Sequence, residues 1–146
     1  MFSPDDAFLT TILSLLRRLP IYAMFGSGMT RLQPAYVEDV AEAIVRALQQ
    51  ADHVTFECGG PRLYTYEELL KMIARKAGLK PILIPVPFVA WQALTAEMMP
   101  NPPITRNQVE LMQVDTVTAP EIPGFSDLGI SPRAVEETLQ EILRLH

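Results

Sequence analysis

The stretch FGSGMTRLQPAYVEDVA, residues 25–41, decides the fold of this 146-residue chain. Its two glycines predict a tight turn, because glycine adopts left-handed backbone conformations without a steric penalty. Residues 31–33 predict a short extended piece, and Val37 begins an apolar pattern of helical period that continues to about Gln49. The stretch therefore predicts a turn, a strand and a helix in quick succession, as in α/β proteins.

Periodic segments flank this stretch on both sides. Upstream, the apolar spacing predicts a helix over residues 4–19 and an extended run over residues 21–24. Downstream, the pattern predicts a strand at 53–58, a helix that Thr65 and Glu68 cap, a strand at 82–86, helices at 88–99 and 105–114, irregular chain at 115–130, and a last helix from Ser131. The run at 82–86 is apolar throughout, which predicts a strand covered on both faces, at an edge because of its proline.

Strands that alternate with helices favour an α/β fold with mainly parallel pairing. Three or four short strands are few for a free-standing sheet of this kind. The sequence therefore predicts an incomplete, helix-rich part of a larger α/β protein, with residues 1–146 forming a single domain.

Composition and charge narrow the class of protein. Hydrophobic residues make up 49% of the chain, and the formal net charge is −5. Lysine and arginine do not gather into a basic stripe, so we expect no nucleic-acid partner. No apolar run approaches the roughly 20 residues of a transmembrane helix, and Met1–Asp6 lacks the basic region of a signal peptide. The sequence therefore predicts a cytoplasmic protein without a transmembrane segment.

The motifs of common active sites are absent from the sequence. Gly26-Ser27-Gly28 is its only G-x-G, and Arg31 stands where a dinucleotide fingerprint needs its third glycine. No tyrosine has a lysine four residues later, so a Tyr-x-x-x-Lys acid–base pair is missing. His53, His146 and Cys58 have no usual metal-ligand spacing, and Cys58 is interpreted as a small buried residue in a strand. We therefore predict no catalytic residue and no metal site in this chain.

Several blocks of sequence, in this order, resemble the extended and atypical short-chain dehydrogenases/reductases of the nucleotide-sugar epimerase type. Residues 25–41 resemble the family's glycine turn, strand and Val-x-Asp-Val-Ala helix start. Other blocks are similar to its FGPxDxF motif, its last sheet strand with the following helix, and the tail of one subgroup: Phe2–Phe8, Phe56–Pro61 with Leu63–Leu69, and Pro100–Glu110 with Pro123–Phe125 and Leu128–Ile130. That subgroup contains bacterial proteins similar to the dehydrogenase-like accessory subunit of respiratory complex I.

The resemblance implies the C-terminal, substrate-side part of a Rossmann-type protein whose N-terminal dinucleotide-binding domain is absent. It implies NAD or NADP in the complete protein and no cofactor in this chain. The implied partners are the missing Rossmann half, a small-molecule substrate such as a sugar nucleotide, and further copies of the chain in a homo-oligomer. The implied function is the substrate-cleft half of an NAD(P)-dependent epimerase or dehydratase, inactive alone; the alternative is a non-catalytic accessory subunit.

The resemblance also implies which residues lie near the substrate and the cofactor. The family's Val-x-Asp-Val segment lies at the cofactor end of the sheet, which places Tyr36, Val37 and Asp39 near that opening. The competing interpretation is that Asp39 caps its own helix and braces a loop.

In epimerases of this family, an arginine just before the Val-x-Asp-Val segment holds the substrate diphosphate. Arg31 is the candidate here, although it stands one residue too early, and a shift of one residue turns a strand side chain to the other face. Arg106 and Arg62 are weaker candidates for the same role.

Overall fold

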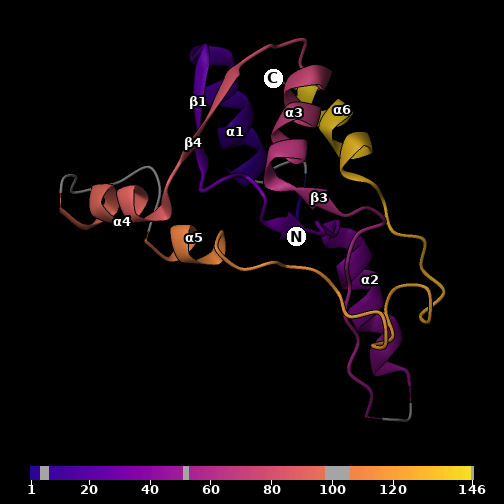
Figure 1. The fold of residues 1–146 in the computed structure, drawn as a ribbon. Helices are drawn as coiled ribbons and strands as arrows, with labels where there is room; N and C mark the ends of the chain where they lie inside the picture. Colours follow the sequence, from indigo (N-terminus) through magenta and orange to yellow (C-terminus); the bar gives the residue numbers. More distant parts are fainter. Residues whose placement is uncertain (4–6, 51–52, 98–105, 146) are drawn as a thin grey trace. The chain divides into compact units, whose positions relative to one another are not determined.

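The computed structural model describes residues 1–3, 7–50, 53–97 and 106–145, and it divides into two compact units. The first unit comprises Met1–Ile12, Gln33–Leu63 and Thr116–His146, and the second comprises Leu13–Leu32 and Tyr64–Asp115. The predicted α/β class with a few short, mainly parallel strands is confirmed (Figure 1). That residues 1–146 form a single domain stays a prediction.

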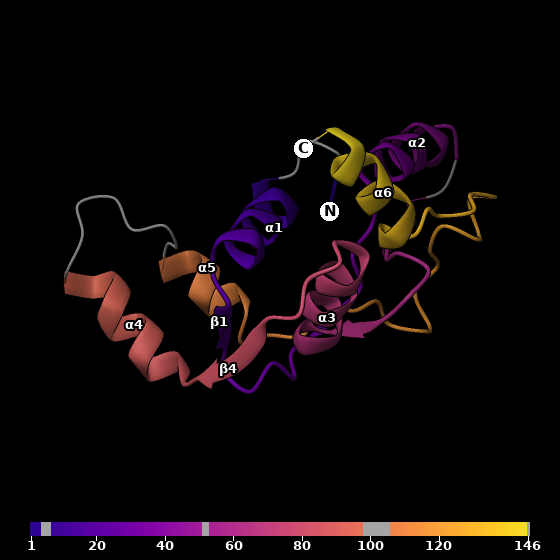
Figure 2. The same cartoon turned by 90° about the horizontal axis from the view of Figure 1, so that it is seen from above.

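The second unit contains a parallel pair of strands. β1 (Ile21–Phe25) lies beside β4 (Ile82–Val86), in a register that pairs Ile21 with Ile82 (Figures 1 and 2). The prediction that β4 is covered on both faces is wrong within the described part of the chain, because Ile82 is 62% exposed and Ile84 is 42% exposed. In the described residues this sheet consists of β1 and β4, so β4 has one neighbouring strand, and the side chains of Ile82 and Ile84 are exposed to solvent.

Helix α3 (Tyr66–Lys76) begins at the predicted capping box. The Glu68 amide donates to the Thr65 hydroxyl at 3.2 Å, and the Thr65 amide donates to the Glu68 carboxylate at 2.8 Å. These bonds hold the pKa of Glu68 below its ordinary value, the bond from the Thr65 backbone most of all. Gly78 ends the helix with a φ of 70°, in the left-handed conformation that glycine favours.

Replacement of the cap tests how much this helix start stabilises the second unit. Thr65→Ala leaves the Glu68 amide without its side-chain acceptor, so we expect a loss of about 1 kcal/mol in the free energy of unfolding. Urea titration followed by circular dichroism measures the change, and Thr65→Ser, which keeps the hydroxyl, is the control. Equal midpoints for the alanine and serine variants would show that the box contributes nothing.

The remaining elements of the second unit agree with the predictions in part, because β3 was not predicted and α5 ends three residues earlier than expected. β2 (Arg31–Leu32) pairs antiparallel with β3 (Tyr64–Thr65). α4 (Phe88–Glu97) and α5 (Arg106–Leu111) follow β4 in the chain (Figure 2). Val109 is buried and Met112 nearly so, as the spacing predicts. The predicted cap of α5 at Thr105 lies outside the described residues.

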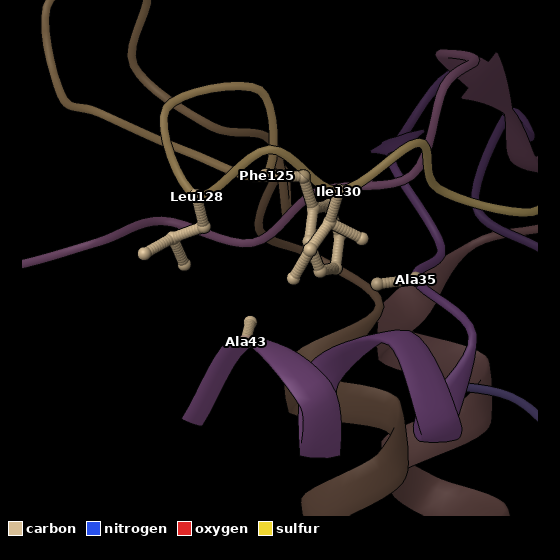
Figure 3. Packing of buried hydrophobic residues seen from close by; sticks show 5 residues of the cluster. All are labelled: Ala35, Ala43, Phe125, Leu128 and Ile130. Carbon is tan, nitrogen blue, oxygen red and sulfur yellow. The ribbon is translucent and has the colours of Figure 1, made fainter. Parts of the chain in front are cut away.

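The first unit is built around helix α2 (Val37–Leu48) and residues 116–134, which we name the strap. Figure 3 shows side chains of the strap pointing toward α2 and Ala35. This buried cluster consists of Ala35, Ala43, Phe125, Leu128 and Ile130. Polar bonds add to it: Arg46 of α2 donates to the carbonyls of Leu128 and Gly129 at 2.7 and 2.9 Å.

Helix α6 (Val135–Leu145) follows the strap, and its predicted apolar face at Val135, Leu139 and Ile142 is buried. The predicted start at Ser131 is wrong by four residues. The backbone amide of Arg133 donates to a side chain of α2 at this point, so residues 131–134 belong to the strap and not to the helix.

Helix α1 (Ala7–Arg18) contributes residues to both units. Four side chains of its apolar stripe are buried, with 2–3% of their surface exposed: Leu9, Ile12, Leu13 and Leu16. Phe8 near the helix start and Leu19 just after the helix end are 40% and 49% exposed, so the stripe is covered in part. The predicted helix start at Pro4 lies outside the described residues.

The predicted strand at 53–58 is also wrong, because residues 53–60 form no strand. The amide of Glu57 donates to the carbonyl of Pro123 in the strap at 2.9 Å. Pro120 and Pro123 have no N–H group to donate in return, so a ladder of backbone bonds cannot form here. Cys58 is consequently half-buried in an irregular segment and not buried in a strand.

Candidate functional site

The start of α2 is built on a short backbone pairing with the N-terminal residues. The Phe2 amide donates to the carbonyl of Ala35 at 2.8 Å, and the Val37 amide donates to the carbonyl of Phe2 at 2.9 Å. Tyr36 between them is extended, and its ring lies 5.4 Å from that of Phe2. The Tyr36 side chain is buried, and burial raises the pKa of its hydroxyl. This pairing fixes the first turn of α2.

Arg133 of the strap binds the first turn of α2 through hydrogen bonds to carboxylates and through a contact of its guanidinium with an aromatic ring. Its Nε atom donates to Asp39 at 2.9 Å, its backbone amide donates to the same carboxylate at 2.6 Å, and Nη2 donates to Glu38 at 2.9 Å. The guanidinium also lies 4.0 Å from the centre of the Tyr36 ring, in a cation–π arrangement. Burial lowers the pKa of Arg133, but the bonds to Asp39 and Glu38 outweigh it, so the pKa is raised overall. We name these four residues the Arg133 cluster.

Two of the predicted site residues, Tyr36 and Asp39, therefore lie together, with Arg133 between them. Asp39 braces the strap and does not cap its own helix, because its oxygens accept from Arg133. Val37 is 39% exposed and takes no part in the cluster. Sequence reasoning missed Arg133, since a residue 94 positions away from Asp39 leaves no local pattern.

Arg31 belongs to the second unit and is held by a carboxylate. Its backbone amide and its Nε atom each donate to Asp115 at 2.8 Å. These bonds, the backbone one first, lower the pKa of Asp115, so this carboxylate stays ionised beside Arg31. A substrate diphosphate at the Arg31 side chain would therefore lie close to the negative charge of Asp115.

The other candidate arginines are Arg62 in the first unit and Arg106 in the second. Arg62 pairs with Glu136 at 2.9 Å and is an exposed side chain. Arg106 begins α5, and its side chain lies outside the described part of the chain. That Arg31, Tyr36, Val37, Asp39 and Arg106 lie near a substrate or a cofactor stays a prediction.

The glycine turn is shaped for packing and not for a pyrophosphate. Gly26 and Gly28 both adopt positive φ angles, of 55° and 75°. A Cβ atom on Gly26 would lie 2.4 Å from the ring of Phe88, so this glycine permits close packing of α4. The amides of the two glycines donate to the carbonyls of Val86 and Phe25, so neither of these two amides is free for a phosphate. The residues of this turn therefore do not fit a dinucleotide.

Shallow hollows lie on the described surface of both units. One in the second unit measures about 570 Å³ and is lined by the charged side chains of Lys71, Arg75, Lys80 and Glu67, the last paired with Lys71 at 2.7 Å. One in the first unit measures about 300 Å³ and lies between the strap and residues 57–59. The Arg133 cluster lines neither hollow.

The reactivity of Cys58 tests the packing beside the strap. The thiol packs against the buried cluster of the first unit, and burial raises its pKa above the ordinary value of 9.0. Because the thiolate is the nucleophile, we expect iodoacetamide at pH 8 to alkylate Cys58 several-fold more slowly in the folded chain than in urea. The folded rate should keep rising as the pH passes 9. Equal rates in buffer and in urea would contradict the burial of Cys58.

Among the described residues, no group of three or more histidine, cysteine, aspartate or glutamate side chains has an arrangement that could hold a metal ion. Over the same residues, the helices are too short or too polar to cross a membrane.

Comparison with known proteins gives sequence relatives of one kind. No family model matches the chain. Subunit 9 of the NADH dehydrogenase (ubiquinone) 1 alpha subcomplex, mitochondrial, from Rattus norvegicus is 32% identical over 151 residues, which cover 100% of this chain and 40% of the relative. The protein of the same name from Arabidopsis thaliana is 27% identical over 150 residues, which cover 93% of this chain and 37% of the relative. The chain thus spans about 40% of the length of the relatives it matches.

Solved structures share the fold. UDP-glucose 4-epimerase from Thermotoga maritima, with UDP-glucose, has a TM-score of 0.58 at 19% identity, over 97% of this chain and 40% of that chain. Triphenylmethane reductase from Citrobacter sp. has a TM-score of 0.67 at 16% identity, over 90% of this chain and 48% of that chain. Relatives and neighbours agree with the resemblance of the motif blocks to the extended and atypical short-chain dehydrogenases/reductases, and the chain forms part of a Rossmann-type fold.

Proposed function

We propose that this chain is the substrate-side part of a longer, NAD(P)-linked protein and has no redox activity alone. The observation that carries the proposal is the glycine turn, whose two glycine amides are bonded to backbone carbonyls and whose glycines pack against side chains. The dinucleotide would be held by residues beyond the matched 40% of the relatives. The purified chain, given NADH or NADPH and a UDP-sugar, is expected to show no turnover above a buffer blank. Measurable turnover would contradict this part of the proposal.

For the complete protein, we favour a non-catalytic accessory subunit over a nucleotide-sugar epimerase. The candidate diphosphate ligand Arg31 is neutralised by Asp115, and Arg133 is neutralised by Asp39 and Glu38. The relatives that cover the whole chain are named as subunits of NADH dehydrogenase, whereas the epimerase is a neighbour in fold at 19% identity. The epimerase role, with a sugar nucleotide as its small-molecule substrate, remains the second candidate.

Two measurements on the longer protein separate these roles. An accessory subunit is expected to migrate with the NADH dehydrogenase complex on native gels and to leave UDP-glucose unchanged. An epimerase is expected to convert UDP-glucose while it migrates apart from the complex. A Tyr-x-x-x-Lys pair in the residues before Met1 would add weight to the epimerase role, since that pair supplies the acid and base of the reaction.

Location and self-association are proposals too. We expect a cytoplasmic location, whereas the relatives are named mitochondrial. Fractionation of cells distinguishes the two locations. Homo-oligomers are expected of the isolated chain because Ile82 and Ile84 are exposed on the open strand β4. Light scattering at high protein concentration tests this, and a monomer would contradict it.

A further inference from the structure

Helix α2 has apolar side chains on the side that faces away from the strap. Val37, Ile44, Val45 and Leu48 are 39%, 56%, 56% and 81% exposed, and Ala41 between them is exposed as well. Positions 37, 41, 44 and 48 follow the spacing of one helical face, since residues three and four apart lie together. We name these five residues the α2 stripe.

The opposite side of α2 is already covered. Ala43 packs under Leu128 and Phe125 of the strap, and Asp39 and Arg46 bind the strap's backbone (Figure 3). A helix that is apolar on two sides is typical of a buried position, where a second neighbour covers the second side. α2 therefore has the composition of a middle layer, with the strap as one outer layer.

We infer that the α2 stripe packs against the nucleotide-binding part of the longer protein, an inference that rests on the function proposed above. The matched region makes up 40% of the relatives' length, so a longer protein of their kind would have residues to cover the stripe. In α/β folds the apolar side of a helix covers the face of a parallel sheet, which is a broad apolar surface.

A second copy of the chain is a poorer occupant on grounds of area. A helix of 12 residues is roughly 18 Å long and offers on the order of 200 Å² along one stripe. A stable dimer buries roughly 800 Å² on each partner, so a stripe of this size cannot hold a dimer by itself. A stripe covered by the same polypeptide does not need that area, because the connection through the chain keeps the two surfaces at high effective concentration.

Substitution of the stripe tests the inference in two forms of the protein. Ile44→Glu is made in the isolated chain and in the longer protein read from the same reading frame, with Val89→Glu, at a 76% exposed position of α4, as the matched control. In the isolated chain both variants should unfold within about 2 °C of the parent. In the longer protein, Ile44→Glu should lower the unfolding midpoint by roughly 10 °C, because the carboxylate is then buried without a partner, while Val89→Glu should not.

Thiol labelling gives an answer that does not depend on the folding of a charged variant. Leu48→Cys in a Cys58→Ser background should react quickly with maleimide in the isolated chain. In the longer protein the labelled peptide should form at least tenfold more slowly. Equal labelling in both forms, a midpoint equal to that of Val89→Glu, or a reading frame that adds no residues would each overturn the inference. Protection of position 48 without NAD(P) binding would refute the proposed function and leave the docking surface in place.

Discussion

Phe125→Ala is expected to lower the free energy of unfolding of the first unit by about 3–5 kcal/mol, the usual cost of removing a buried phenylalanine. Phe125 is 4% exposed and lies at the centre of the cluster between the strap and α2 (Figure 3). Its loss leaves a cavity that Leu128 and Ile130 cannot fill, because neighbouring backbone is fixed by the bonds of Arg46. Small domains are stable by about 5–15 kcal/mol, so this change removes a large share of the total.

Urea unfolding followed by circular dichroism measures the change in Phe125→Ala. The matched control is Phe8→Ala, at a position that is 40% exposed, which should cost about 1 kcal/mol or less. Hydrogen exchange of the α2 amides should rise in the first variant and stay unchanged in the control. A midpoint for Phe125→Ala equal to that of the control would show that the strap does not hold α2.

Arg133→Ala is expected to cost about 3 kcal/mol, the second of the large effects. The substitution leaves the Asp39 carboxylate, whose side chain is 5% exposed, without its charged partner, and an unpaired buried charge is expensive. The guanidinium is itself 44% exposed, which keeps the expected cost at the low end of the range for buried pairs. The tyrosine ring beneath it also loses its cation–π contact.

Companion variants show whether the cost of Arg133→Ala comes from the pair. Arg133→Lys keeps the charge but cannot reproduce the guanidinium's two carboxylate bonds, so we expect it to restore half of the stability or less. Asp39→Ala with Arg133→Ala should cost less than the sum of the single changes, by about 1–3 kcal/mol. Additive single changes would mean that Arg133 contributes packing and no coupling to Asp39.

Local signals in the sequence predict local structure well in this chain. Thr65 and Glu68 form the capping box because each lies within reach of the other's backbone, so no distant partner is needed. The turn glycines and Gly78 adopt positive φ angles for the same reason, since the backbone conformation is decided within a few residues. β1 and β4 were predictable as segments from their apolar runs, although their exposure was not.

The errors concern features that depend on distant parts of the chain. Residues 53–58 have the composition of a strand, but a strand needs a neighbour with free N–H groups, and the prolines of the strap supply none. Ser131-Pro132 has the composition of a helix start, but the bond from the Arg133 amide to Asp39 delays α6 to Val135. The Arg133 cluster was missed because its partners are 94 or more positions apart.

Titration of NAD(H) and NADP(H) into the isolated chain and into the longer protein, by calorimetry, tests the central claim most directly. According to that claim, residues outside these 146 bind the dinucleotide, and the 146 residues form the substrate-side part of the longer protein. The predicted result is that the isolated chain gives no saturable binding heat, whereas the longer protein binds the dinucleotide saturably. Saturable micromolar binding by the isolated chain would contradict it.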